Sequence, residues 1–318
     1  MYAAVLHEFG SPPRFEEFDD PVARDGEVLV RVRAASLKPI DKLMAGGAHY
    51  ASIRELPVVC GVDGVGTLAT GERVLFGGSR PPFGAMAEKA VAPRAFCLPL
   101  PNGLDDATAA ALPNPAASSW LPLKWRAQLR PGETVLVLGA TGVAGKLAVQ
   151  IAKILGAGRV IAAGRNPQAL ESTRSLGADL TIQLDQPRES LVQAFATAAK
   201  DGIDVVLDYL WGAPTEALVE ALTGHDFTAE PHTTRLIEIG SSAGSTMALP
   251  GAALRSSGLE IYGSGGGSVP RQAIAEAIPE ILQCAARGDL KLETRSVPLA
   301  DVETMWNQRE HRRVVFVP

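Results

Sequence analysis

The sequence has too few cysteines for a disulfide framework. Only Cys60, Cys97 and Cys284 occur in 318 residues, and no two of them form a C-x-x-C pair. Such isolated cysteines favour reduced, mostly buried thiols. The five histidines also fall at no spacing that would bring several of them onto one metal ion, and zinc needs three or four converging ligands. We therefore expect no metal site.

Long apolar runs and excess charge are absent as well. No apolar stretch approaches the roughly 20 residues of a membrane span, and residues 1–10 carry no basic region followed by an apolar core. The formal net charge of −5 gives no reason to expect nucleic acid or an anionic membrane as a partner. The chain is long enough for two domains, each with its own core. We expect a cytoplasmic protein with neither nucleic-acid nor membrane partners.

The most informative stretch is residues 134–157, which predicts a strand, a tight turn and a helix. An apolar run leads into Gly139, Gly142 and Gly145, and apolar residues at helical spacing follow. Glycines let a turn approach a phosphate, and the helix N-terminus offers N–H groups and a positive dipole end there. The spacing is G-x-x-G-x-x-G rather than the commoner G-x-G-x-x-G, and a purely structural turn is the alternative. The residues expected around a dinucleotide pyrophosphate are Gly139, Thr141, Gly142, Val143 and Ala144.

The order of elements changes along the chain. Residues 1–112 are β-rich with dense turns, and short helices are expected over 99–125. From Glu133 strand and helix alternate, which predicts a doubly wound parallel sheet covered on both faces. Pro279 is expected to kink or split a helix over 271–287. The expected strands of the sheet are 134–138, 159–163, 181–184, 204–208, 235–240 and 259–263, with helices at 143–155, 168–176, 188–199 and 214–222.

The end of the second strand favours NADP(H) over NAD(H). An NAD site places an acid there to bind the ribose 2′-OH, but this strand ends in Gly164, Arg165 and Asn166. A guanidinium suits a 2′-phosphate, and a small residue before it leaves room. A solvated loop cation is the alternative for Arg165.

Two further segments follow predicted strands at the carboxyl edge of the sheet, where ligands bind in open α/β folds. Gly240 and Ser241 follow the strand at 235–240. Gly265 belongs to the glycine-rich loop 263–267, whose backbone is able to approach a bound cofactor closely. A plain flexible connection is the alternative for this loop.

Five more motifs occur in a familiar order. They are ASLKPID (35–41), PVVCGVDGVGTL (57–68), FGAMAEKAVAP (83–93), ATAAALPNPAASSWLPL (107–123) and VLDYLWG (206–212). Together with the glycine turn they resemble the medium-chain dehydrogenase/reductase superfamily, and within it the zinc-independent quinone oxidoreductase branch. The resemblance spans nearly the whole chain.

The resemblance implies a GroES-like, β-rich catalytic domain over 1–116, completed by 265–318. It implies a Rossmann NADP(H)-binding domain over 117–264, with the active site in the cleft between the domains. It also implies a homodimer formed by pairing of cofactor-domain edges.

Zinc relatives carry a Cys at the start of the catalytic segment and a G-H-E triad. This chain has Ser36, Leu37 and Lys38 in the first region and Gly61-Val62-Asp63 in the second. The resemblance therefore implies a metal-free enzyme. Without a Lewis acid to stabilise an alkoxide, hydride addition to a quinone or an α,β-unsaturated carbonyl is favoured over oxidation of a plain alcohol.

Three positions transfer from the family to the nicotinamide and substrate region. Ser118 is expected to bond the nicotinamide ribose or carboxamide, with a helix N-cap or turn serine as the alternative. Lys38 replaces the usual Asn and is expected either to donate to a developing enolate oxygen or anchor the ribose, or to be an ion-paired lysine with Asp41 or Asp63. Tyr50 is expected to contact the substrate, with packing as the alternative.

These observations support an NADPH-dependent, zinc-free reductase of an electrophilic small molecule, either a quinone or an activated enone. The alternative is an NADPH-binding protein of low turnover with a structural or redox-sensing role. The two differ in whether any acceptor consumes NADPH.

Overall fold

The computed structural model describes residues 1–47, 55–223, 232–308 and 310–318. The chain divides into two units, one formed by residues 1–113 with 282–318 and the other by residues 114–281. The chain enters the second unit after residue 113, close to the expected boundary at 116. It returns to the first unit after residue 281, which is later than the expected boundary at 264 and lies inside a helix. No helix in the described ranges is long and apolar enough to span a bilayer.

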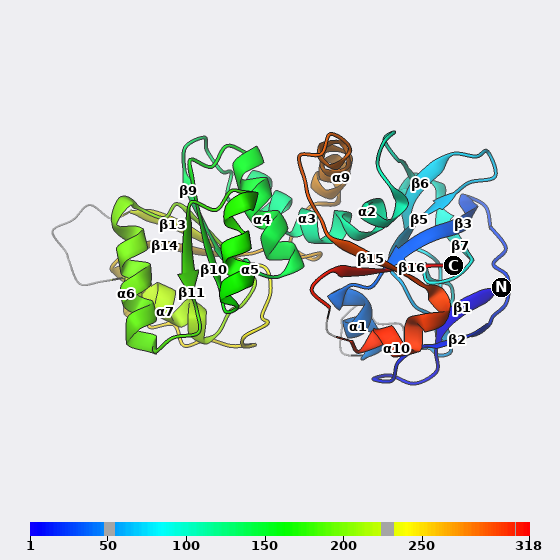
Figure 1. Cartoon of the computed structure of the whole chain (residues 1–318), viewed down its shortest axis with the longest axis horizontal. Helices are drawn as coiled ribbons and strands as arrows, with labels where there is room; N and C mark the ends of the chain where they lie inside the picture. Colours follow the sequence, from blue (N-terminus) through cyan, green and yellow to red (C-terminus); the bar gives the residue numbers. More distant parts are fainter. Residues whose placement is uncertain (48–54, 224–231, 309) are drawn as a thin grey trace. The chain divides into compact units, whose positions relative to one another are not determined.

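The unit of residues 114–281 contains one six-stranded parallel sheet (Figure 1). Its strands are β9 (Thr134–Leu138), β10 (Arg159–Gly164), β11 (Leu180–Gln183), β12 (Val205–Asp208), β13 (Thr233–Glu238) and β14 (Gly258–Gly263). The spatial order is β11-β10-β9-β12-β13-β14, and every neighbouring pair is parallel. Counted from the first strand of the sheet, this is the 3-2-1-4-5-6 order of the doubly wound fold.

Helices cover both faces of this sheet, α4 and α5 on one side and α6 and α7 on the other (Figure 1). Side chains along a strand point alternately to the two faces of the sheet. Those of Leu136 and Leu138 point to the face covered by α6 and α7, where they join Phe195 and Leu218 in a buried core. Both faces of β9 are buried, as expected of a central parallel strand. The helix bounds are α4 (Val143–Ile154), α5 (Pro167–Ser172), α6 (Arg188–Ala198), α7 (Ala213–Leu222) and α8 (Gly251–Arg255).

Two more helical segments belong to the regions around this sheet. Helix α3 (Pro113–Leu121) runs directly into η2 (Pro122–Arg126), a turn of π-helix. Helix α9 (Arg271–Ala286) continues through Pro279, so the predicted split is wrong. A proline removes one helical hydrogen bond, and Ala277, Ile281 and Leu282 of this helix are buried around it.

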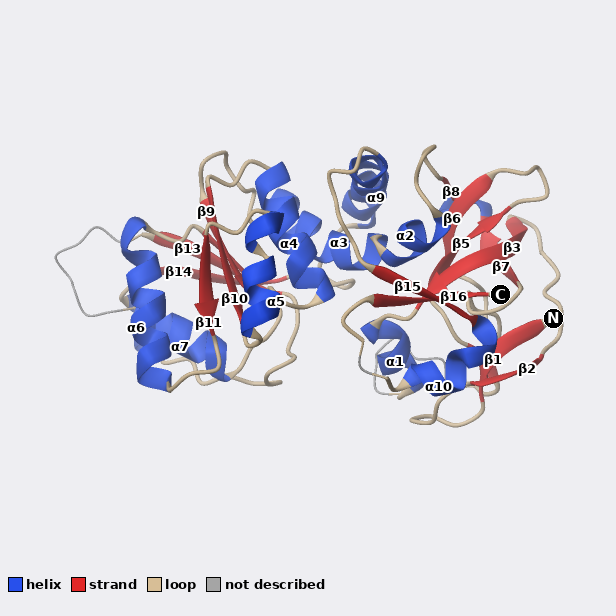
Figure 2. Ribbon diagram, viewed as in Figure 1, coloured by secondary structure: helices blue, strands red, loops and turns tan. Residues whose placement is uncertain are grey.

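The other unit is built from β-strands (Figure 2). A seven-stranded sheet has the order β15-β16-β3-β5-β6-β8, with β7 also paired to β3, and a three-stranded sheet has the order β2-β1-β4. The strand bounds are β1 (Tyr2–Leu6), β2 (Arg14–Glu17), β3 (Glu27–Ser36), β4 (Val58–Val59), β5 (Asp63–Thr67), β6 (Arg73–Gly77), β7 (Lys89–Pro93), β8 (Leu98–Pro99), β15 (Thr294–Pro298) and β16 (Arg313–Val317). The helices of this unit are α1 (Pro39–Ala45), α2 (Asp106–Ala111) and α10 (Val302–Trp306).

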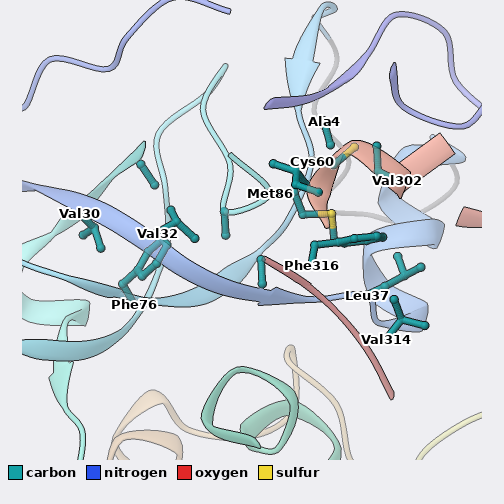
Figure 3. Packing of buried hydrophobic residues seen from close by; sticks show 14 of the residues in the cluster. Ala4, Val30, Val32, Leu37, Cys60, Phe76, Met86, Val302, Val314 and Phe316 are labelled. Atoms are coloured by element: carbon teal, nitrogen blue, oxygen red, sulfur yellow. The ribbon is translucent and has the colours of Figure 1, made fainter. Parts of the chain in front are cut away.

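The C-terminal segment completes the core of this unit. Phe316 of β16 is fully buried in the same cluster as Met86 and Phe76, and Val302 of α10 joins them (Figure 3). Strand β16 pairs with β3 through Phe316 and Ala35. Fully burying a large apolar side chain contributes about 1.5–3 kcal/mol to stability. The C-terminal residues Val302 and Phe316 therefore stabilise a core that the N-terminal strands begin.

Candidate active site

The carboxyl ends of the parallel strands collect the predicted cofactor residues at one edge of the sheet. Because all six strands run the same way, the residues that follow them share this edge, which is where open α/β sheets bind ligands. The segments at this edge begin at Gly139 after β9, Arg165 after β10, Tyr209 after β12, Ile239 after β13 and Ser264 after β14.

The three glycines of the turn after β9 serve different purposes. Gly139 has a φ of 91°, which side-chain-bearing residues rarely adopt, and its N–H donates to Ala163 O at 3.0 Å. A Cβ at Gly145 would lie 2.2 Å from Gly139 O, so α4 packs directly on the turn. A Cβ at Gly142 would meet only Gly139 O, at 3.7 Å. Packing in this chain therefore requires glycine at 145 but not at 142.

The N-terminus of α4 follows this turn and suits an anion. Its N-cap is Gly142, and no side chain caps it. The first N–H groups of a helix have no intrahelical acceptor, and they carry the positive end of the dipole. Val143 and Ala144 are half-buried and Thr141 is partly exposed at this position. The chemistry of this segment suits an anion, and its assignment to a dinucleotide pyrophosphate stays a prediction.

The end of β10 separates the three residues predicted for the 2′-phosphate. Gly164 is buried, and a Cβ there would lie 2.4 Å from Thr141 Cγ2. The absence of a side chain at 164 therefore lets Thr141 of the glycine turn pack against β10. Asn166 caps α5, because its Oδ1 accepts the N–H of Ala169 at 2.9 Å. Arg165 is exposed and has no ion pair or hydrogen bond among the described residues. Of the three residues, Arg165 is therefore the one whose side chain is available to bind a ligand.

Ser118 lies in the middle of α3, so the N-cap alternative is wrong. Its Oγ donates to Pro115 O at 2.7 Å and lies 3.2 Å from Tyr209 Oη, which donates to Ser118 O at 3.1 Å. Burial raises the pKa of Tyr209 to about 12, although the hydrogen bond with Ser118 opposes this shift. The phenol therefore stays protonated at neutral pH. Tyr209 was not predicted as a site residue, and its signals in the sequence are its position directly after a strand at the carboxyl edge and its place in the motif VLDYLWG.

Asp208 fixes the backbone after β12. Its buried carboxylate accepts hydrogen bonds from the amides of Leu210 (2.8 Å) and Trp211 (2.9 Å) and from Thr215 Oγ1 (2.6 Å). Burial nevertheless raises the pKa of Asp208. Trp211 has a φ of 55°, an outlier for a bulky residue, and these bonds hold it there. Trp211 packs partly buried against the adjacent core.

The segments after β13 and β14 are tied to their neighbours. The N–H of Gly240 donates to Asp208 O at 3.2 Å, while Ser241 is exposed. The N–H of Ser264 donates to Glu238 O at 2.8 Å, and that of Gly265 donates to Ser268 Oγ at 2.9 Å. Gly240, Ser241 and Gly265 thus stand at the same edge as the glycine turn.

In the β-rich unit, Lys38 is the centre of a buried ion cluster. The residue is 1% exposed, and its Nζ donates to Asp63 Oδ1 at 2.8 Å and to Ser36 O at 3.1 Å, with Asp41 Oδ2 at 3.6 Å. This is the ion-pair alternative, and it involves both carboxylates rather than one. Burial alone lowers the pKa of Lys38, but Asp41 and Asp63 together raise it above its usual value. The amine is therefore charged.

The local sequence explains why these groups meet. Lys38 is extended, with φ −115° and ψ 157°, as expected before a proline, and Pro39 begins α1. Asp41 accepts the N–H of Lys38 at 2.8 Å and that of Val62 at 3.0 Å, which joins the helix start to the residue before β5. Burial raises the pKa of Asp41. Arg313 donates to Leu37 O at 2.9 Å from the other side.

Tyr50 lies outside the described residues, so the structure says nothing of it. Within the described ranges, no group of three or more His, Cys, Asp or Glu side chains could hold a metal ion. His7 and His232 instead lie beside Glu16 and Asp204, at 2.7 and 3.2 Å. The metal-free interpretation stays a prediction.

Two family models match the chain. Residues 24–102 match the alcohol dehydrogenase GroES-like domain, and residues 143–283 match the model described as a zinc-binding dehydrogenase. The first segment falls in the β-rich unit, and the second falls in the unit with the parallel sheet except for its last two residues.

Individual relatives point in the same direction. The chain is 30% identical to the quinone oxidoreductase of Thermus thermophilus, whose structure with NADPH is known, with both chains fully covered and a TM-score of 0.81. It is 28% identical, over the whole of both chains, to a probable NADPH-dependent quinone reductase, tdiC, of Emericella nidulans. A chloroplastic NADPH-dependent alkenal/one oxidoreductase of Arabidopsis thaliana is 30% identical over 59% of this chain and 51% of its own length.

Proposed function

The chain belongs to the quinone oxidoreductase-like branch of the medium-chain dehydrogenase/reductase superfamily, and we infer that it is an NADPH-dependent oxidoreductase acting on a quinone or an α,β-unsaturated carbonyl compound. Its fold is the GroES-like domain plus Rossmann sheet of that superfamily. NADPH-dependent relatives of both activities support the cofactor and the reaction.

The observation that carries the proposal is the carboxyl edge of the sheet. This edge combines three features that suit a dinucleotide: a helix N-terminus without a side-chain cap, a glycine at 142 with open space around it, and the exposed cation Arg165. We assign the pyrophosphate to the turn, with Gly139, Thr141, Val143 and Ala144 around it. We assign the 2′-phosphate to Arg165, whose guanidinium suits bidentate contact with a phosphate.

The remaining edge residues are proposed for the nicotinamide half. Ser118, Gly240, Ser241 and Gly265 come from α3 and from the loops after β13 and β14. Tyr209 positions Ser118 through two contacts, at 3.1 and 3.2 Å. Bound NADPH would supply the hydride. The protein's part is to hold the two reactants in a reactive geometry.

For Lys38 we propose a positioning role. Its Nζ makes three contacts with Asp63 and Ser36, at 2.8, 3.1 and 3.3 Å, which account for its three protons. Direct donation to an enolate oxygen would require one of these bonds to break. Asp63 is the more accessible partner, with a quarter of its side chain exposed, so Lys38 holds a partly exposed carboxylate in place.

Consumption of NADPH against a panel of quinones and enals tests this function. We expect acceptor-dependent oxidation of NADPH at a higher kcat/KM than of NADH. Tight NADPH binding without oxidation by any acceptor would favour the low-turnover, structural or redox-sensing alternative.

Cofactor preference is tested separately with Arg165→Glu. Because this change replaces an exposed cation by an anion, we expect the KM for NADPH to rise by about tenfold or more, with NADH little affected. Arg174→Glu is the matched control, because Arg174 is already ion-paired with Glu171 at 3.0 Å. Equal responses of the two variants to NADPH would contradict the assignment.

We further propose a homodimer in which β14 of two copies meet, and a cytoplasmic location. In the described sheet β14 is an end strand that pairs only with β13, and unpaired strand edges favour pairing with another chain. Light scattering on the purified chain is expected to give twice the mass of 33.3 kDa. Ile261→Pro, within this strand, should lower that mass.

A further inference from the structure

Arg126 holds both ends of the glycine-rich loop after β14. Its Nε donates to Gly263 O at 3.0 Å, where β14 ends, and its Nη2 donates to Ser268 O at 3.2 Å. Residues 264–267 lie between these two carbonyls, with the sequence SGGG. One planar guanidinium thus closes the base of the loop, with two N–H donors held in a fixed geometry.

The segment that carries Arg126 is itself firmly held. Arg126 is the last residue of the π-helix η2, which the 2.7 Å bond from Ala127 N to Pro122 O closes. Arg235 of β13 donates to Ala127 O, and the Arg126 guanidinium lies over the Trp125 ring, 4.6 Å from its centroid. Single turns of π-helix are frequent at functional sites. Arg126 is therefore a fixed support for the loop.

Three glycines at the start of this loop and within it have no explanation within the described chain. Gly263, Gly265 and Gly267 do not have positive φ angles, and a Cβ at any of them would meet no atom within 4 Å. Neither backbone conformation nor intramolecular packing requires glycine at these positions. Glycine also costs conformational entropy on folding. A bare backbone with open space around it suits close approach by a molecule from outside the chain.

The loop stands where such a molecule is expected. Ser264 N donates to Glu238 O at 2.8 Å, so the loop starts at the carboxyl edge of the sheet, on the side of β12 and β13 away from Arg165. A dinucleotide with its 2′-phosphate at β10 and its pyrophosphate at β9 would extend its other half in this direction.

We propose that Arg126 is a positioning residue for the cofactor, which shapes loop 264–267 to receive the nicotinamide end of NADP(H). Arg126 does this through the loop backbone and does not touch the cofactor itself. The inference rests on the proposed function, since it names a further residue of the same site.

The test compares two ligands on the full-length protein. NADPH contains the nicotinamide, whereas adenosine 2′,5′-bisphosphate carries the 2′-phosphate without it. In Arg126→Ala we expect the NADPH affinity to fall about tenfold, because the loop loses two charge-assisted bonds, and the affinity for adenosine 2′,5′-bisphosphate to stay unchanged. Arg126→Lys should recover at most part of the loss. Lys124→Ala is the matched control, since Lys124 lies on the same π-helix but pairs with Glu280 of α9.

A second variant tests the bare backbone independently. Gly267→Ala adds a methyl group where the protein leaves space, so we expect an unchanged melting temperature together with weaker NADPH binding. Unchanged NADPH affinity in Arg126→Ala and Gly267→Ala would overturn the inference, as would equal losses for the two ligands. Failure of the wild-type protein to bind NADPH would overturn the proposed function and this inference with it.

Discussion

Gly145 and Gly142 lie three residues apart in one turn, but the structure predicts opposite consequences for the same change to alanine. A Cβ at position 145 would lie 2.2 Å from Gly139 O and 2.6 Å from Ala140 Cα. Ordinary contacts begin at 3.4 Å, so α4 must move away from the turn by about 1.2 Å (3.4 − 2.2) or distort. At position 142 the nearest atom lies 3.7 Å away, and the methyl group fits.

The magnitudes follow from packing and helix propensity. Overpacking typically costs about 1–3 kcal/mol, and the severity of this clash puts Gly145→Ala near the upper end. Replacing a glycine inside a helix recovers about 1 kcal/mol, which leaves a net loss of about 2 kcal/mol. The melting temperature should fall by roughly 4–8 °C. For Gly142→Ala we expect a change in the unfolding free energy of at most about 1 kcal/mol, because an N-cap alanine is only modestly worse than glycine.

Thermal melts and NADPH titrations of both variants provide the assay. If the pyrophosphate approaches the backbone at 142, Gly142→Ala should weaken NADPH binding by about tenfold while leaving stability nearly unchanged. An unaffected melting temperature for Gly145→Ala would refute the packing argument. Full NADPH affinity in Gly142→Ala would refute close approach of the pyrophosphate to that residue.

Three further predictions concern other parts of the molecule. Lys38→Met should destabilise the protein by about 3–5 kcal/mol in urea unfolding, because it leaves buried carboxylates unpaired, and adding Asp63→Asn should recover part of that loss; no loss in the single variant would contradict the ion-cluster assignment. Cys60, whose pKa burial raises from 9.0 to about 12, should resist a thiol reagent at pH 8 until the chain unfolds. Between these two values the thiol ionises in the unfolded chain but not in the folded one. The contribution of Cys60 to the free energy of unfolding is therefore complete below pH 9 and decreases from pH 9 towards 12. In Cys60→Ala the unfolding free energy should depend less steeply on pH in this range. Asn166→Ala should cost about 1 kcal/mol through loss of the α5 cap while leaving the preference for NADPH over NADH unchanged, and a changed preference would assign Asn166 to the cofactor.

The parallel sheet was predictable because each of its elements carries its own local signal. The apolar run before Gly139 predicts β9 to the residue, and α4 differs from its prediction by one residue at its end. The β-rich unit was less predictable, because its pairings are long-range. Strand β7, for example, begins only at Lys89, because the N–H groups of Ala85 and Met86 donate instead to Gly61 O and Cys60 O. Helix α1 was missed because it has only seven residues.

The candidate site divides in the same way. The glycine turn and Arg165 could be predicted because their chemistry follows from spacing along one strand-turn-helix unit. The partner of Lys38 could not be chosen from sequence, because Asp41 and Asp63 both qualify, and the fold brings both to the amine. Tyr209 lies 91 residues from Ser118, and Arg126 lies 137 residues from Gly263. No periodicity connects side chains at such distances, so these contacts required the fold.

A single-turnover experiment tests the central claim most directly. The protein is mixed with one equivalent of NADPH and then, without oxygen, with excess quinone or enal, while the absorbance of the reduced nicotinamide is followed. The account predicts that the absorbance of bound NADPH disappears only when an acceptor is added, and faster than in the absence of protein. NADPH that stays bound and reduced in the presence of every acceptor would contradict it.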